Sequence, residues 1–477
     1  MKWKSLAVYG LILLILAGFY YYVDVYKRKE KEKAELQARK VFDFSPDKIS
    51  EVRVVRSDGK TVKLVKEEKG WVIREPLQAA ADDASVKGLL NVMADLEADR
   101  WIDVKGGEAG QYGLDRPNLV IEAVDSEGKH VLSVGIKNPA ETHYYARVGE
   151  SKRVFLMSAS RWNILNKDVY DLRRKELAVF QNDDVEAITV SWADGGSVEV
   201  KKESDKWFSP QEPDVKIKSS KVENVIDQIR WLRARKFLDE LTGGEDGEGS
   251  LLSKYGLDKP EVKVDVLLQG GKKIRIAFAE PEEGSNTELV AYSSDLGSIV
   301  NTDRDVLGEL PKTLHDLEDR SLFTWQEESV GRLVWKKKER SVEITRAEDD
   351  KWKVSVNGGK SEELEEGWRI RSVFWDLEDL EYEKELKPVP SLPAEPLYGL
   401  TFFDTDKEEL ARWIWNELPA EEEEKESPER VVTLWVVKGE KVEKAVEVKA
   451  SLLGDIVDKL DNTVKDLEKD EKKEENR

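Results

Sequence analysis

One segment of the chain resembles the end of a phosphate-binding loop, in which backbone amides and a lysine hold the phosphates of a nucleotide. It covers residues 354–361 and ends in Lys360-Ser361. The first glycine of such a loop is missing, because position 354 is a valine. Asn357-Gly358 between alternating apolar residues is instead typical of a hairpin turn. We therefore predict a turn at this place and no nucleotide cofactor.

Side chains that bind transition metals or act as general bases are scarce. The only histidines are His130, His143 and His315, and they show no paired ligand spacing. The sequence therefore predicts neither a histidine metal site nor a Ser-His-Asp triad, and we expect these histidines at the surface. Cysteine is absent, which excludes disulfides, iron–sulfur clusters and thiol nucleophiles.

Carboxylates, in contrast, are so abundant that their positions select no pair. Clusters occur at Asp183-Asp184 and from Glu421 to Glu424. Two facing carboxylates would serve a glycoside hydrolase, and this alternative stays open. We predict no catalytic, cofactor-binding or metal-binding residue. The net charge of -21 also argues against nucleic acid as a partner.

The tripeptide Tyr-Gly-Leu occurs three times, 143 residues apart each time, beginning at Tyr112, Tyr255 and Tyr398. Glycine permits a tight turn, a following proline fixes how the chain enters the next strand, and tyrosine and leucine can pack. We favour this structural role, while a ligand-contacting loop repeated three times remains the alternative. The residues assigned to this element are Tyr112, Gly113, Leu114, Pro117, Tyr255, Gly256, Leu257, Pro260, Tyr398, Gly399 and Leu400.

Other elements also recur around each tripeptide. Each copy opens with a predicted hairpin followed by a tryptophan, Trp71, Trp207 or Trp352, which we expect to anchor a core. An amphipathic helix follows, with apolar residues at i, i+3, i+4, i+7 and i+10. Asp83 or Ser85 is expected to cap the first helix, and Ser219 or Ser220 the second. The helical faces are Val86, Leu89, Leu90, Met93 and Leu96; Val222, Val225, Ile226, Ile229 and Leu232; and Ile370, Val373, Phe374, Leu377 and Leu380.

About four more strands and a second amphipathic helix ending in Asp-Leu are expected to close each copy. We therefore predict an α+β fold of three tandem antiparallel sheet-plus-helix modules. Their predicted ranges are 41–177, 178–322 and 323–467, followed by a charged tail at 468–477. Loops at 242–250 and 387–396 interrupt the second and third modules.

An apolar stretch precedes the modules. Residues 6–23 carry no charge, which predicts a transmembrane anchor over residues 5–25, followed by a charged stalk at 26–40. A cleaved signal peptide is the alternative, although no small-x-small site follows the stretch. Cations on both sides leave the orientation in the membrane open.

The repeated pattern resembles the domain-of-unknown-function family 4340. The residues that carry the resemblance are Trp71, the helix from Ser85, the turn from Tyr112 to Pro117, and Asp171-Leu172-Arg173. The second copy matches through Trp207, the turn from Tyr255 to Pro260, and Asp316-Leu317. The third copy retains Trp352 and Tyr398-Gly399-Leu400, but Thr401 and the lack of a following proline depart from the pattern.

The resemblance implies a membrane-anchored, non-enzymatic accessory protein, because members are often encoded beside ABC transporters of the gliding-motility type. It implies a single-pass protein of the cytoplasmic membrane whose modules face the periplasm and bind an ABC permease, its ATPase complex or an extracytoplasmic subunit. Two alternatives remain at this point. One is a freestanding tethered scaffold of the cell envelope, and the other is a membrane-anchored envelope hydrolase.

Overall fold

The computed structural model describes residues 3–22, 29, 35–104, 108–238, 248–282, 284–348, 351–364, 366–416 and 430–474. Two compact units make up the chain: Met1–Glu212 with Ser219–Asp316, and Pro213–Lys218 with Leu317–Arg477. Several predicted segments lie outside the described residues. These are most of the charged stalk at 26–40, the part of the glycine-rich loop at 242–247, the acidic run at 421–424 and the last three residues of the tail.

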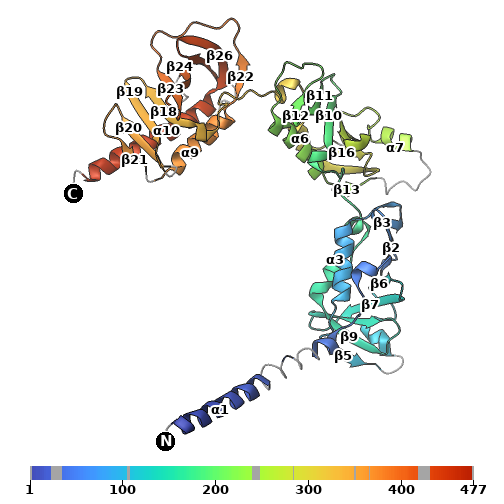
Figure 1. Cartoon of the computed structure of the whole chain (residues 1–477). Helices are drawn as coiled ribbons and strands as arrows, with labels where there is room; N and C mark the ends of the chain where they lie inside the picture. The colour runs from blue at the N-terminus through green and yellow to red at the C-terminus, as the bar shows by residue number, and fades with distance from the viewer. Residues whose placement is uncertain are drawn as a thin grey trace. The chain divides into compact units, whose positions relative to one another are not determined.

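The first sheet contains nine antiparallel strands in the order β4-β3-β2-β1-β6-β7-β8-β9-β5. Figure 1 labels β3, β2, β6, β7, β9 and β5 of this sheet. Alternating apolar residues set its register, so that Val52 lies opposite Leu64 and Val54 opposite Val62, all four buried. The strands are β1 Glu51–Arg56, β2 Thr61–Glu67, β3 Gly70–Glu75, β4 Ala79–Ala80, β5 Arg100–Asp103, β6 Leu119–Val124, β7 Lys129–Lys137, β8 His143–Val148 and β9 Arg153–Ser158.

The second and third sheets repeat this order. The second runs β12-β11-β10-β14-β15-β16-β17-β13 and the third β21-β20-β19-β18-β23-β24-β25-β26-β22. Within the described residues 209–218, the second sheet has no strand at the place of β4. Their strands are β10 Val185–Trp192, β11 Ser197–Glu203, β12 Lys206–Phe208, β13 Lys236–Phe237, β14 Val262–Leu268, β15 Lys273–Ala279, β16 Glu288–Ser293, β17 Ser298–Asp303, β18 Val330–Lys337, β19 Arg340–Arg346, β20 Trp352–Val356, β21 Glu362–Glu363, β22 Tyr382–Glu385, β23 Tyr398–Asp404, β24 Glu409–Trp415, β25 Val431–Lys438 and β26 Lys441–Lys449.

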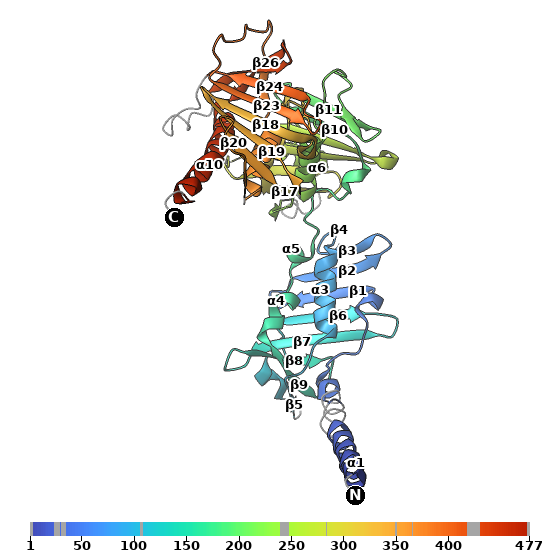
Figure 2. The same ribbon diagram turned by 60° about the vertical axis from the view of Figure 1, so that its left-hand side comes forward.

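Each sheet is associated with the predicted amphipathic helix, which is α3 (Asp83–Ala94), α6 (Ser219–Trp231) or α9 (Trp368–Asp379). Figure 2 shows α3 running across the strands on one face of the first sheet. All fifteen residues of the three predicted apolar faces are buried. The structure therefore has three large antiparallel sheets with helices, and more strand than helix.

The predicted N-caps were wrong in detail. Asp82, not Asp83 or Ser85, caps α3, because its side chain accepts a hydrogen bond from the backbone N–H of Ser85 at 3.0 Å. Asp83 instead accepts a hydrogen bond from the backbone N–H of Trp71 at 2.8 Å and so ties the helix to β3. Ser219 and Ser220 are the first two residues of α6 and lie inside that helix.

The predicted second amphipathic helix is also wrong for two of the three copies. Asp171-Leu172 ends a single turn, α5 (Val169–Leu172), and Asp316 ends the 3₁₀ turn η8 (Leu314–Asp316). After each turn the chain is held by backbone bonds to neighbouring segments, which a continuing helix could not make. Among the described residues, a long closing helix occurs with the third sheet alone; it is α10 (Ala450–Glu474), which packs on α9.

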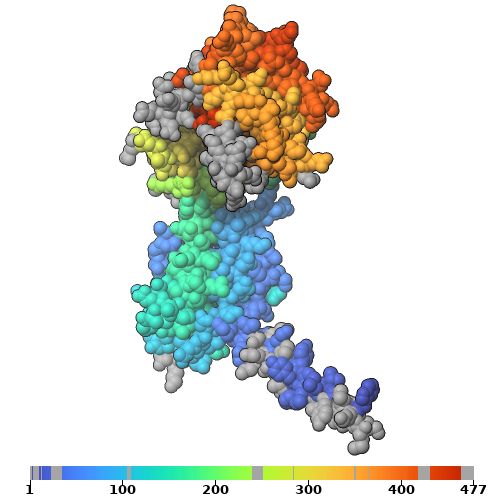
Figure 3. All heavy atoms as spheres, turned by 90° about the vertical axis from the view of Figure 1, so that its left-hand side faces the viewer, coloured from blue at the N-terminus to red at the C-terminus, as the bar shows by residue number. Residues whose placement is uncertain are grey.

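Short helices fill the remaining connections. They are η2 Pro46–Lys48, η3 Glu108–Tyr112, η4 Ala159–Arg161, α4 Trp162–Leu165, η5 Asn182–Asp184, α7 Glu248–Lys254, η7 Gln269–Gly271, α8 Val306–Glu309 and η9 Glu327–Ser329. On the face shown in Figure 3, the atoms of the first sheet and its helices form a continuous packed surface.

The structure corrects the predicted fold class at residues 5–25, where we expected a transmembrane helix. The apolar stretch begins in α1 (Trp3–Tyr20), which is 18 residues long. Across the part of the chain that the structure describes, no helix is both long and apolar enough to cross a membrane.

Candidate functional site

The three histidines lie apart from one another, and two of them bond to a single carboxylate each. His130 Nε2 is 3.0 Å from Asp125 Oδ2, and its ring stacks on Phe44. His143 Nε2 is 3.1 Å from Asp99 Oδ2. Within the described ranges, no group of three or more histidine or acidic side chains is placed to hold a metal ion. These imidazoles therefore serve local hydrogen bonds.

The segment that resembles a phosphate-binding loop is the predicted turn. Asn357 and Gly358 both have positive φ angles, 50° and 72°, and they follow β20. The backbone N–H of Asn357 donates to the carbonyl of Ser341, and its side-chain oxygen accepts from the backbone N–H of the same serine. Strand β21 follows this turn, where a phosphate-binding loop would begin a helix.

The first two Tyr-Gly-Leu elements form the predicted tight turn. Gly113 and Gly256 have φ angles of +70° and +71°, which glycine adopts without strain. The leucine that follows each glycine, Leu114 or Leu257, is buried. Pro117 and Pro260 each lie two residues before a strand, β6 or β14. In both copies this turn leads into a strand.

The third Tyr-Gly-Leu is not a turn, which corrects the prediction. Tyr398, Gly399 and Leu400 are the first residues of β23, and Leu400 lies opposite Trp335 of β18. The equivalent position is occupied by Ile121 of β6 in the first sheet and by Val264 of β14 in the second. The tripeptide therefore recurs by chance seven residues beyond the turn position, counted from Tyr112 to Leu119 and from Tyr255 to Val262.

The turn at Tyr112 depends on a second glycine, which leads to a testable prediction. A Cβ at Gly135 would lie 2.0 Å from the carbonyl oxygen of Tyr112. We expect Gly135→Ala to lower the free energy of unfolding by at least about 2 kcal/mol, because backbone has to move. Gly88→Ala in α3 is the matched control, since its Cβ meets nothing within 4 Å and should raise helix stability slightly. Equal denaturation midpoints for the two variants would contradict this account.

The segment between the first two sheets, residues 170–178, is named here the first connector, and it is hydrogen-bonded on both sides. Toward the first sheet, the backbone N–H of Asp82 donates to the carbonyl of Leu172 at 2.8 Å. Toward the second, the backbone N–H of Leu177 donates to the carbonyl of Leu232 at 3.0 Å. The connector therefore joins the start of α3 to the end of α6.

Arg173 is the most buried cation of the first connector, at 2 % exposure. Its guanidinium donates to Ser298 Oγ at 2.5 Å and lies 3.7 Å from the centroid of the Phe237 ring. Arg174 beside it donates to the carbonyl of Asp295 at 2.6 Å. Sequence reasoning noted Arg173 only as part of the family pattern and gave it no contact.

The second connector, residues 315–323, repeats these bonds within the second unit. The backbone N–H of Lys218 donates to the carbonyl of Leu317 at 2.9 Å, and that of Leu322 to the carbonyl of Leu380 at 3.2 Å. Arg320 takes the place of Lys175 and donates to the carbonyl of Tyr382 at 2.7 Å. The same backbone bonds thus recur at both connectors.

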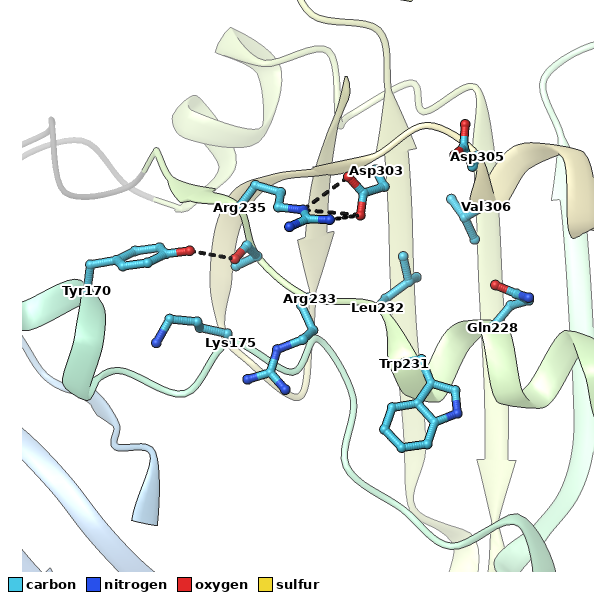
Figure 4. Close-up of a pocket in the computed structure, with 11 residues that line it drawn as sticks. Tyr170, Lys175, Gln228, Trp231, Leu232, Arg233, Arg235, Asp303, Asp305 and Val306 are labelled. Carbon is cyan, nitrogen blue, oxygen red and sulfur yellow. Dashed lines mark hydrogen bonds and ion pairs between the residues drawn. The ribbon is translucent and has the colours of Figure 1, made fainter. Parts of the chain in front are cut away.

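The first connector borders a pocket of about 320 Å³ (Figure 4). Tyr170 of α5 reaches across it, and its hydroxyl donates to the carbonyl of Ala234 at 3.3 Å. Trp231, the last residue of α6, lines the pocket although 67 % of its surface is exposed. The full lining comprises Tyr170, Lys175, Gln228, Trp231, Leu232, Arg233, Ala234, Arg235, Asp303, Asp305 and Val306.

The three cations of this pocket are held by neighbouring oxygens. Arg235 contacts both carboxylate oxygens of Asp303, and Arg233 lies 2.8 Å from Glu176. Lys175 donates to two carbonyls of its own connector, and burial lowers the pKa of its ammonium group. Guanidinium groups and an exposed indole suit the binding of an anionic or planar polar group. This lining makes the pocket a candidate binding site.

Glu261 and Glu280 form a pair of neighbouring carboxyl groups outside this pocket. Burial raises the pKa of Glu261, and the adjacent carboxylate of Glu280 raises it further. A hydrogen bond from Arg304 lowers the pKa of Glu280. Carboxyl groups with pKa values moved apart suit proton transfer, and this pair is the position to test for the hydrolase alternative.

Sequence reasoning missed the connectors and Trp231. Backbone-to-backbone bonds leave no side-chain pattern, so the connectors carried no signal beyond Asp171-Leu172-Arg173. Trp231 had one usable signal. It lies on the side of the helix opposite the apolar face, at a position two residues beyond Ile229, where a large aromatic residue gains nothing from the core.

Comparison with solved structures gives weak likenesses only. A DNA polymerase sliding clamp from Pseudomonas aeruginosa, solved with a ligand, is 10% identical, with 87% of this chain and 95% of that chain covered, at a TM-score of 0.13. The DNA polymerase III subunit beta from Pseudomonas aeruginosa is also 10% identical, covering 87% and 96%, at a TM-score of 0.15. Neither likeness supports an argument about fold or function.

Comparison with curated proteins finds no match. A family model does match, and it covers the chain from the tryptophan of the first hairpin, through the first connector, to the proline after the second turn. Residues 71–260 match the family described as Domain of unknown function (DUF4340), which is the family that the sequence pattern resembles.

Proposed function

We propose that this protein is a non-enzymatic accessory subunit of an ABC-type transport system, in which tandem copies of one domain bind the transporter or its substrate. The observation that carries the proposal is the threefold repetition of one strand order with the same connector bonds. A chain that builds the same domain repeatedly gains binding surface, because each domain presents its own loops and helix ends.

The family supplies the kind of partner. The resemblance to the family that residues 71–260 match implies an ABC transporter of the gliding-motility type as the partner. The proposed place is next to the cytoplasmic membrane, with the domains facing the periplasm. The exposed tryptophan and arginines of the pocket beside α6 supply a contact surface of the composition that protein interfaces favour.

Co-purification tests this proposal. We expect the full-length tagged chain, cross-linked in cells and extracted in mild detergent, to bring down a permease and an ATPase. Trp231→Ala should reduce that recovery, whereas Trp368→Ala, which removes a similarly exposed tryptophan from α9, should not. Recovery of the chain alone in every preparation would contradict the proposal and favour the freestanding scaffold.

Two further measurements separate the remaining alternatives. Protease should digest the domains in cells stripped of any outer barrier, and protection would place them in the cytoplasm instead. The purified chain should release no sugar from envelope glycans. If the parent chain releases sugar and the Glu261→Gln variant does not, the protein is a hydrolase and the accessory-subunit interpretation is wrong.

A further inference from the structure

A second pocket lies within the second unit, between the second connector and α9. Its volume is about 820 Å³. Two kinds of side chain dominate its lining. The aromatic residues are Phe323, Trp325 and Trp375, and the acidic residues include Glu327, Glu328 and Glu378. We refer to it below as the acidic groove.

The aromatic side of the acidic groove is fixed by the core beneath it. Phe323 is buried, and its ring contacts Trp325 edge-on at a centroid distance of 5.4 Å. The Trp325 ring also lies 5.7 Å from that of Phe402 in β23. Trp375 comes from α9 and leaves 57 % of its surface exposed. Exposed indole faces attract cations through the negative charge above and below the ring.

The carboxylates of the acidic groove are only partly neutralised. Glu327 pairs with Arg346 at 3.3 Å and with Arg371 at 3.9 Å. The one lysine of the lining, Lys218, pairs with Glu381 at 2.9 Å. Among the contacts of the described residues, Glu328 and Glu378 have no cationic partner. Partial burial and the neighbouring carboxylates raise the pKa of Glu378, which shows that negative charge is crowded at this place.

We propose that the acidic groove binds an extended, arginine- or lysine-bearing segment of a partner protein, with one basic side chain over Trp375. The free carboxylates come from two elements, the segment after the connector and α9, so that several basic side chains are needed to pair them. A peptide supplies such charges in a row, and a single small cation does not. The inference rests on the proposed function only in taking this chain to be a binding protein.

Calorimetric titration of the purified full-length chain with a short peptide of alternating arginine and glycine tests the inference. Trp375→Ala should weaken binding roughly three- to tenfold through the lost cation–π contact. Glu328→Gln and Glu378→Gln should each weaken it roughly two- to fivefold. The chain carries a net charge of -21, so a peptide of alternating glutamate and glycine serves as the negative control.

Matched variants separate groove binding from general attraction of opposite charge. Trp368→Ala removes a tryptophan of similar exposure, 61 %, from the same helix, but Trp368 does not line the groove. Asp379→Asn removes the same charge as Glu378→Gln from the neighbouring position, which is also outside the lining. Both controls should bind the peptide as the parent chain does.

Three outcomes would overturn the inference. In the first, Trp375→Ala and Trp368→Ala change the affinity for the arginine peptide equally. In the second, the parent chain does not bind this peptide at physiological ionic strength. The third is tetramethylammonium binding as tightly as the peptide, which would make the occupant a small cation. The titration needs no transporter, so its failure is distinguishable from failure of the co-purification experiment.

Discussion

Trp352→Ala should lower the free energy of unfolding of the second unit by about 3–5 kcal/mol. Trp352 begins β20 and is only 1 % exposed. Its ring lies 5.6 Å from that of Phe374 on α9, and the guanidinium of Arg346 lies 4.5 Å from its centroid. The side chain therefore joins strand, helix and cation, and truncation leaves a cavity where all three meet.

Differential scanning calorimetry of the full-length chain measures this effect. We expect the transition of the second unit to shift down by on the order of 10 °C, with the remaining transition unchanged. Hydrogen exchange should assign the shift, because amides of β18, β19 and β20 should lose protection. Trp368→Ala is the control, since that tryptophan is exposed. A common melting temperature for both variants would contradict a core role for Trp352.

Long elements were predictable because periodicity determines which face is buried. The spacing of Val86, Leu89 and Met93 identified α3, and the same spacing identified α6 and α9. The alternation at Val262, Val264 and Val266 identified β14. Short strands gave no such signal. Strands such as β13, two residues long, form because a neighbouring strand offers bonding partners, and that information is not local in sequence.

The third Tyr-Gly-Leu was wrongly predicted to be a turn because its sequence is identical to that of the two turns. Tyr398-Gly399-Leu400 matches the turn tripeptide letter for letter, yet Tyr398 is buried between Trp335 and Trp415 in a sheet. The surrounding aromatic core stabilises an extended strand here, and Gly399 has no positive φ angle. The transmembrane prediction was also wrong, because no helix within the described ranges is long and apolar enough to cross a membrane.

The candidate binding surfaces could be predicted only in part. The exposed tryptophans Trp231, Trp368 and Trp375 stand opposite the apolar faces of their helices, which a helical projection of the sequence shows. Whether one of these tryptophans borders a pocket depends on the position of the neighbouring connector. Backbone hydrogen bonds hold each connector against the helix ends, and no side-chain spacing in the sequence predicts these bonds.

The largest effect expected at a connector is that of Arg173→Ala. The substitution removes the hydrogen bond to Ser298, which is itself buried, and the contact with the ring of Phe237. The Ser298 hydroxyl keeps its own bond to the carbonyl of Leu296, so the loss is that of a hydrogen bond from a charged donor, about 1.5–3 kcal/mol, and of a desolvated cation–π contact, up to about 2 kcal/mol. We therefore expect a loss of about 2–4 kcal/mol, and faster exchange of the amides of Asp82 and Leu177.

Arg153→Ala is the matched control for this prediction. Its guanidinium also lies over an aromatic ring, 4.5 Å from that of Trp101, and pairs with Asp103, but its side chain is 53 % exposed. Solvent screens that pair, so we expect a loss below about 1 kcal/mol and unchanged exchange at the connector. Hydrogen exchange of the connector amides, measured by mass spectrometry on the full-length chain, compares the two variants. If Arg173→Ala leaves the amides of the connector as protected as Arg153→Ala does, the arginine is not what holds the connector to the second sheet.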